Sequence, residues 1–223
     1  MLVHAFIPIS FKYNDFDKSL TRFQIDLSGR NLLSRTISIL NSIDEISETF
    51  IFCSNEKITE IPDKECKFAY SNRSEDLDSE DASIESIIEE FIKLHPADIF
   101  ILIHPKSPFI KSDSIRECIN KVIKDNFDSA FTAKKYEKIA WFENKKVNLG
   151  SDCDTPRPKN LKPIFIENSG VYVFRQETFK NLRQRIGENP FIKIVNHFEG
   201  FEIEMIDDYE IAELIINAGL DKK

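Results

Sequence analysis

The chain has 223 residues, of which 41% are hydrophobic and 30% charged, and its formal net charge is −8 at neutral pH. This length and composition are typical of one globular domain with a core of ordinary size. An acidic chain without a basic stripe is a poor partner for nucleic acid, and no apolar run approaches the roughly 18 residues of a membrane-spanning helix.

The N-terminus is predicted to be a strand rather than a signal peptide, because residues 2–8 are apolar and no basic segment precedes them. The four cysteines are widely spaced and form no C-x-x-C pair, which favours reduced thiols. We therefore expect a cytoplasmic protein that interacts with neither nucleic acid nor a membrane.

Strands and helices alternate along the chain. We expect strands at 2–8, 49–53, near 67–70, 99–103, 128–133, 164–174, near 191–196 and 201–206, and helices at about 30–41, 82–94, 113–125, 176–185 and 207–219. This order predicts an α/β fold, a mostly parallel, Rossmann-like sheet with helices on both faces, in a single domain over 1–223. Residues 136–162 depart from the pattern and are predicted to form a small excursion or arm.

Two helices show a clear apolar stripe. In the helix at 30–41 the predicted inward residues are Leu32, Leu33, Thr36, Ile37 and Leu40. In the helix at 82–94 they are Ile84, Ile87, Ile88, Phe91 and Leu94, and the acidic residues of 75–90 form the solvated face. The uninterrupted apolar run at 99–103 predicts a strand that is covered on both faces.

The strand at 164–174 is interrupted once, by the polar residues Glu167-Asn168-Ser169-Gly170. Buried polar groups must find hydrogen-bond partners, and a glycine inside a strand indicates a bulge or a close backbone approach. Polar groups on rigid strands also suit the binding of a small polar ligand. From these residues alone, an ordinary bulged strand and a ligand site are equally acceptable.

Ligands of open parallel sheets bind at the carboxyl ends of the strands, beside the switch point. This rule selects the loop after the first strand, the loop after Ile103, and the break at 167–170. The loop after Ile103 reads His104-Pro105-Lys106-Ser107-Pro108. Its two prolines make it rigid, which suits recognition of a nucleobase or ribose; the alternative is a turn defined by its prolines.

Several ordered motifs together resemble the acylneuraminate cytidylyltransferases, the CMP–nonulosonic acid synthetases. Residues 104–108 are similar to the family's Gln-Pro-Thr-Ser-Pro loop. Residues 157–163 are similar to the family's Arg-x-x-Asp-Leu-x-Pro segment, and residues 167–174 are similar to the Glu-Thr-Ser-Gly-x-Tyr-x-Phe segment that follows it. Residues 184–190 and 202–212 match two further motifs, and residues 77–83 match the family's Leu-Ala-x-Asp-x-Ala-Ser segment. The resemblance covers essentially the whole chain.

The resemblance implies transfer of CMP from CTP to the anomeric hydroxyl of a nonulosonic or related sugar acid, with release of pyrophosphate. It implies Mg²⁺ or Mn²⁺ as cofactor, a metal pair formed by Glu202 and Glu204, and a homodimer in which the 136–162 region exchanges between subunits. It assigns catalytic roles to Lys18 and Arg22, nucleotide contacts to Ser10, Lys12, Arg73, Glu80, Asp81, His104 and Ser107, and acceptor contacts to Lys106, Arg157, Glu167, Asn168, Tyr172 and Arg185.

The sequence departs from the family pattern at the phosphate loop and at the metal pair. No glycine precedes Gly29, and Ser10 stands where the family has an arginine. Glutamates replace both metal-binding aspartates, and Lys106 replaces a threonine. Three hypotheses remain open: an active CMP-transferase, a nucleotidyltransferase with another nucleotide or acceptor, and a weak or inactive homologue that binds a ligand or a partner subunit.

Overall fold

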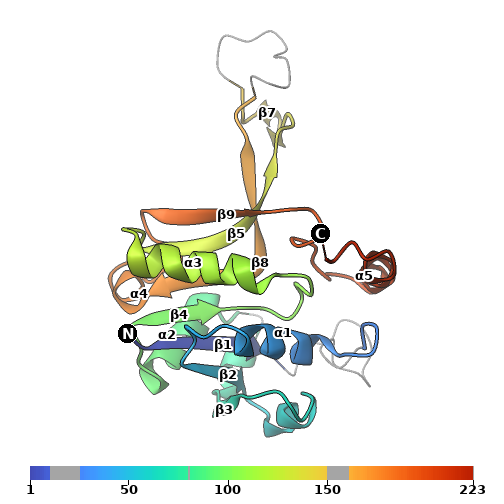
Figure 1. Cartoon of the computed structure of the whole chain (residues 1–223). Helices are drawn as coiled ribbons and strands as arrows, with labels where there is room; N and C mark the ends of the chain where they lie inside the picture. Colours follow the sequence, from blue (N-terminus) through green and yellow to red (C-terminus); the bar gives the residue numbers. More distant parts are fainter. Residues whose placement is uncertain (11–25, 80, 150–160, 223) are drawn as a thin grey trace.

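The computed structural model describes residues 1–10, 26–79, 81–149 and 161–222. Within them, a seven-stranded sheet has the order β3-β2-β1-β4-β8-β5-β9 (Figure 1). Its strands are β1 (Val3–Ile9), β2 (Glu48–Cys53), β3 (Ala69–Asn72), β4 (Ile99–Leu102), β5 (Ser129–Tyr136), β8 (Ile164–Arg175) and β9 (Pro190–Val195). All are parallel except β8, which is antiparallel to both β4 and β5. The predicted mostly parallel α/β sheet is confirmed.

Helices cover both faces of the sheet, as predicted. They are α1 (Leu32–Asn41), α2 (Ile84–Leu94), α3 (Ser112–Lys124), α4 (Gln176–Leu182) and α5 (Asp207–Asn217), with 3₁₀ turns η1 (Glu56–Glu60) and η2 (Glu75–Asp78). One core cluster joins α1 and α3 to one face, and a second, rich in phenylalanine, joins α2 and α4 to the other. No described helix is long and apolar enough to cross a membrane.

The apolar stripe of α1 is buried as predicted. The predicted stripe of α2 also faces the core, where Ile84 and Ile87 are partly buried, but it fails at its last residue. The buried residues of α2 are Ile88, Phe91 and Ile92, which have the spacing i, i+3, i+4, while Leu94 is 51% exposed. The prediction for Leu94 was therefore wrong: it is the last residue of the helix and has already turned away from the sheet. Ser83 begins the helix by accepting a hydrogen bond from the Ser86 amide (3.2 Å).

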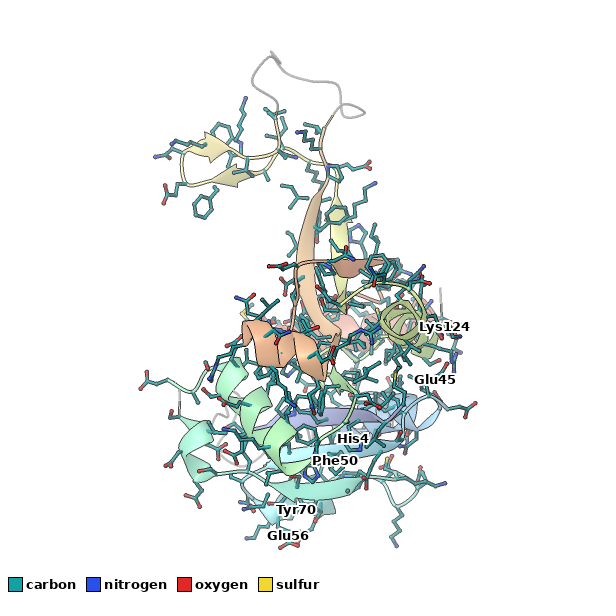
Figure 2. The ribbon with its side chains drawn as sticks, turned by 90° about the vertical axis from the view of Figure 1, so that its left-hand side faces the viewer. His4, Glu45, Phe50, Glu56, Tyr70 and Lys124 are labelled. Carbon is teal, nitrogen blue, oxygen red and sulfur yellow. The ribbon has the colours of Figure 1, made fainter. Side chains whose placement is uncertain are left out.

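The second core cluster contains a histidine that has no role in a site. His4 lies on β1 with its ring 5.2 Å from that of Phe50, and Figure 2 labels both residues in the sheet. Its Nδ1 lies 3.3 Å from the His95 carbonyl oxygen, and His95 Nε2 is 2.7 Å from Ser71 Oγ. These contacts fit a structural role for His4 and His95.

The polar interruption of β8 is a bulge. Phe131 pairs with Tyr172 and Ala133 pairs with Glu167. An advance of two positions on β5 therefore corresponds to an advance of five positions on β8. The Val171 amide donates to Thr132 Oγ1 (3.2 Å). This hydrogen bond satisfies an amide that the bulge removes from the hydrogen-bond ladder between β5 and β8. A Cβ at Gly170 would stand 2.7 Å from that same oxygen, so the glycine is needed for close approach.

Beyond the sheet, β5 and β8 continue as a two-stranded ribbon into the predicted arm. The arm carries the short hairpin β6 (Trp141–Phe142) and β7 (Lys145–Lys146), and it projects away from the helices (Figures 1 and 2). The buried Asn148 holds the base of this hairpin: it accepts from the Ala140 amide and donates to the carbonyls of Lys138 and Lys162. The arm is thus a defined element rather than a long loop.

Two predicted elements differ. The helix at 176–185 ends at Leu182, because Arg183 adopts a left-handed conformation (φ 52°) that terminates it. The predicted strand at 201–206 is absent. Its alternating pattern arises differently: Ile203 enters the cluster beneath α5, and its amide donates to the Lys106 carbonyl (2.8 Å) rather than to a strand.

Residues 187–189 are clamped onto the start of β5. The Gly187 amide donates to Ser129 Oγ (2.8 Å), and the Asn189 amide donates to Asp128 Oδ2 (2.8 Å). A Cβ at Gly187 would lie 2.3 Å from Asp128 Cγ, so a side chain there requires the carboxylate to move. This clamp fixes the segment that begins with Arg185.

We predict that Gly187→Ala lowers the free energy of unfolding by about 1–3 kcal/mol, because the added methyl displaces Asp128 from its hydrogen bonds. Urea denaturation followed by circular dichroism measures this change. Glu188→Ala, at the exposed next position, is the matched control and should change stability by less than about 0.5 kcal/mol. Equal stability of the two variants would contradict the clamp.

Candidate nucleotide and acceptor site

The candidate site lies at the switch point of the sheet. The chain passes from β1 to β2 and β3 on one side, and returns to pair β4 with β1 on the other. A cavity of about 180 Å³ opens where β1 and β4 end, and Ser10, Arg73 and His104 all line it, together with Asp78 and Ile87. Three residues predicted for nucleotide binding are therefore brought together from distant parts of the chain.

Larger hollows of about 390 and 370 Å³ occur elsewhere on the described surface. The first is lined by residues of α1, β2 and the segment before β3, and the second by residues around the Asp128 clamp and α4. Neither contains a predicted site residue. Volume alone is therefore a poor guide here, and the position at the switch point is the better one.

Arg73 is the buried cation of the cavity, with only 2% of its surface exposed. Its Nη2 donates to the Ile9 carbonyl (3.0 Å) and forms an ion pair with Asp78, which also accepts a hydrogen bond from Ser54 Oγ. The guanidinium carbon lies 5.8 Å from the centre of the Phe52 ring. Arg73 Nε has no partner among the described residues, so one donor remains for a ligand.

Asp78 was not predicted as a functional residue. It belongs to the acidic run 75–90, where the pattern predicted only a solvated face. In the structure it is 2% exposed and holds Arg73 in place. A buried carboxylate requires a cation, but the sequence does not say which arginine supplies it.

The loop after β4 contributes a neutral imidazole and a free hydroxyl. His104 is half-buried. Its burial, and then the nearby positive charges of Lys106 and Arg185, lower the pKa of its imidazole to about 4. His104 is therefore uncharged at neutral pH. Ser107 is 1% exposed and its Oγ finds no partner in the described part of the chain, and the same holds for the buried Oγ of Ser10.

A second group of predicted residues gathers around the bulge of β8. Tyr172 donates its hydroxyl hydrogen to Glu167 Oε2 (3.0 Å), and the Arg185 guanidinium stacks on the Tyr172 ring at 4.4 Å. Arg185 also lies 3.5 Å from a Glu85 oxygen and 3.9 Å from Glu167 Oε2, but its buried Nε has no partner in the described residues. Asn168 is 1% exposed, and both atoms of its amide group are likewise unpaired.

The two groups meet at Lys106. Its Nζ lies 2.5 Å from Glu204 Oε1 and 3.3 Å from Glu202 Oε1, and Glu202 Oε1 also accepts from the Ser169 amide of the bulge (2.9 Å). The two glutamates predicted as a metal pair therefore converge on a lysine ammonium, and the strand predicted to carry them is not formed. Among the described residues no cluster of three or more His, Cys, Asp or Glu side chains has the geometry of a metal site.

Part of the predicted site lies outside the described residues: Lys12, Lys18, Arg22, Glu80 and Arg157. Asp81 is described and exposed, and it precedes Ala82, which lines the switch-point cavity.

A doubly covered, mostly parallel sheet with a cavity at its switch point defines the protein as a Rossmann-like α/β protein, in which ligands bind at that point. A family model described as "Cytidylyltransferase" matches residues 24–214. The chain belongs to this family of nucleotidyltransferase enzymes.

Known relatives agree with this membership. The chain is 24% identical over 153 residues to N-acylneuraminate cytidylyltransferase A of Danio rerio, and 24% identical over 150 residues to N-acylneuraminate cytidylyltransferase of Oncorhynchus mykiss. Each match covers 63% of this chain but only 34% of the relative, so the chain spans about a third of the relatives' length.

Solved structures confirm the fold. The 4-diphosphocytidyl-2C-methyl-D-erythritol synthase of Anaerococcus prevotii superposes with a TM-score of 0.64 at 14% identity, over 97% of this chain and 96% of that one. A CMP:2-keto-3-deoxy-manno-octonic acid synthetase complexed with CTP gives 0.59 at 14% identity, over 98% and 87%.

We predict that His104 lowers the free energy of unfolding in acid. Its folded pKa of about 4 lies below the ordinary 6.5, so the unfolded chain takes up a proton first, and stability falls as the pH drops from about 6.5 to 4. His104→Gln should remove about 1–3 kcal/mol of the loss in unfolding free energy between pH 7.5 and 4.5. Urea unfolding at the two pH values measures it. His197→Gln, at an exposed position, is the control; an equal effect of both changes would contradict the burial argument.

Proposed function

We propose that this chain transfers CMP from CTP to the anomeric hydroxyl of a nonulosonic or related sugar acid and releases pyrophosphate. The observation that carries the proposal is the switch-point cavity, in which Ser10, Arg73 and His104 converge and where Ser10 Oγ and Arg73 Nε have no partner among the described residues. Family membership supports cytidylyl transfer, and the relatives named for N-acylneuraminate support a sugar acid as acceptor.

The cavity suits the nucleoside part of CTP. Arg73 Nε donates, the neutral His104 imidazole both donates and accepts, and the Ser10 hydroxyl does the same. Each of these groups is buried or half-buried and held by the protein before a ligand arrives. Hydrogen bonds to such pre-positioned groups fix the base and ribose with little loss of side-chain entropy.

The group around the β8 bulge suits the acceptor. Arg185 is fixed by stacking on Tyr172 and keeps a free Nε, so its planar fork is positioned for the carboxylate of a sugar acid. The unpaired amide of Asn168 and the carboxylate of Glu167 provide contacts to sugar hydroxyls. Arg157, which the sequence assigns to the same carboxylate, lies outside the described residues.

In the reaction, the anomeric oxygen forms a bond to the α-phosphorus while the bond from that phosphorus to the pyrophosphate oxygen breaks, and the hydroxyl proton passes to solvent. Positioning and charge stabilisation account for most of such catalysis. Lys12, Lys18 and Arg22 of the first loop are proposed to hold the phosphates. Glu202 and Glu204 are proposed to hold a divalent cation, Mg²⁺ or Mn²⁺, which would neutralise the triphosphate when bound.

Two measurements on the purified chain test this proposal. CTP should raise the melting temperature by mass action, more than ATP, GTP or UTP does. Incubation with CTP, divalent metal and a panel of nonulosonic acids should then release pyrophosphate. Stabilisation by CTP without pyrophosphate release would favour the ligand-binding homologue, and preference for another nucleotide would favour altered specificity.

We predict that Arg185→Met raises the KM for the sugar acid by about 10- to 100-fold, as expected for loss of a charged hydrogen bond. Stabilisation by CTP should change little, because Arg185 does not line the switch-point cavity. Arg183→Met is the matched control, since Arg183 is exposed and pairs only with Glu89 among the described residues. An equal loss of CTP and acceptor binding would place Arg185 elsewhere in the mechanism.

We also propose that the arm forms a homodimer, as the resemblance implies. Trp141 and Phe142 stand 60% and 69% exposed at its hairpin, which is unusual for aromatic side chains without a partner surface. Sedimentation equilibrium should show a dimer for the parent chain and a monomer for a Trp141→Ser/Phe142→Ser double variant. A monomeric parent at high micromolar concentration would contradict this proposal.

A further inference from the structure

Lys106 occupies the position of the cation in the Glu202–Glu204 pair. Its Nζ is 2.5 Å from Glu204 Oε1 and 3.3 Å from Glu202 Oε1. The Lys106 and Glu202 side chains are 24% and 16% exposed, so their contact is shielded more than an ordinary surface ion pair, whereas the Glu204 side chain is 59% exposed. Because the lysine stands 98 positions away from Glu204 in the sequence, only the fold brings these charges together.

The backbone fixes this arrangement. The Ile203 amide donates to the Lys106 carbonyl (2.8 Å), so the segment between the two glutamates is docked on the loop that carries the lysine. The Ser169 amide binds Glu202 Oε1, and Asp208 Oδ2 accepts from the amides of Glu204 and Met205 (2.7 and 2.8 Å). The Glu202 carboxylate and the backbone of Glu204 are therefore held in position beside the ammonium.

The same oxygens are those that a hard divalent cation would bind. Carboxylate oxygens suit Mg²⁺ and Mn²⁺, and Mg²⁺ requires oxygens at about 2.0–2.1 Å. The ammonium contacts one oxygen of each glutamate, so a metal ion and Lys106 Nζ repel each other and compete for the same atoms. The donor set fits a divalent ion, but only after the lysine has moved.

We propose that Lys106 is a built-in competitor for the divalent cation: it holds the carboxylate pair in the metal-free protein and is released when the metal binds. The released ammonium lies on the His104–Pro108 loop beside the nucleotide cavity, where it becomes available to an anionic substrate. Binding of the metal and release of the Lys106 ammonium toward the substrate then occur together. The inference rests on the proposed function only for the use of Glu202 and Glu204 as a cation site.

The first test is Mn²⁺ affinity without nucleotide, measured from the free-ion signal in electron paramagnetic resonance. Lys106→Met should bind Mn²⁺ about five- to tenfold more tightly than the parent, the range expected for removal of one partly exposed ion pair. Lys106→Arg, which keeps the charge, should remain weak. Lys193→Met is the matched control: Lys193 Nζ also lies 2.5 Å from a glutamate, Glu117, and its side chain is also 24% exposed.

The second test uses the parent chain, so it does not depend on the folding of a variant. Acylation of lysines by an amine-reactive reagent, followed by mass spectrometry, should become at least about fivefold faster at Lys106 when saturating Mg²⁺ or Mn²⁺ is added. The rate at Lys193 should not change.

Unchanged or weaker Mn²⁺ binding by Lys106→Met, or an unchanged acylation rate at Lys106, would overturn the inference. Failure of all forms to bind Mn²⁺ at millimolar concentration would overturn it too. CTP is absent from both experiments, so failure of the proposed function, seen as the absence of stabilisation by CTP, is a separate result.

Discussion

The antiparallel insertion of β8 between β4 and β5 determines where the chemistry of this protein can lie. Val173 pairs with Ile101 on one side and with Ala130 on the other, so β8 joins the two halves of the sheet. Because β8 runs against its neighbours, its beginning lies where their carboxyl ends lie. The bulge at 167–170 is therefore brought to the ligand edge of the sheet, and the arm that precedes β8 projects from that same edge (Figure 1).

The site brings several cations together although the protein is acidic. Each described cation of the site is already paired: Arg73 with Asp78, Lys106 with Glu202 and Glu204, and Arg185 with Glu85 and Glu167. The pairs hold long side chains in one geometry and reduce the cost of burying their charges. Specific donors, the Nε atoms of Arg73 and Arg185, remain unpaired. An anionic ligand thus meets fixed donors rather than mobile lysines.

Much of this fold was predictable because most elements carry a repeating pattern. The apolar run of β4 and the stripe of α1 follow directly from burial on one or both faces of a sheet. The segment 201–206 shows the limit of this approach. Its alternation is real, but one set of residues packs beneath α5 and the other contacts Lys106, which produces the same pattern as a strand.

The site was predictable as a set of segments but not as a set of contacts. The rule that ligands bind at the carboxyl ends of strands placed 104–108 and 167–170 together, and the structure agrees. The pairs Arg73–Asp78 and Lys106–Glu204 depend on loop conformations that no periodicity encodes. Asp78 in particular looked like one more residue of an acidic surface, and only its burial distinguishes it.

Three of the departures from the family pattern, at Lys106, Glu202 and Glu204, occur at positions that contact one another, and this changes what each of them means. Taken singly, a glutamate in place of a metal-binding aspartate suggests a weakened site, and so does a lysine in place of a threonine. In the structure the lysine lies between the two glutamates. A longer carboxylate reaches the ammonium from a segment that is docked through its backbone and is not part of a sheet. An uncompensated carboxylate pair would repel itself, and a lone lysine beside Arg185 would repel its neighbour. The three residues are physically consistent as a group, because the ammonium balances the two carboxylates.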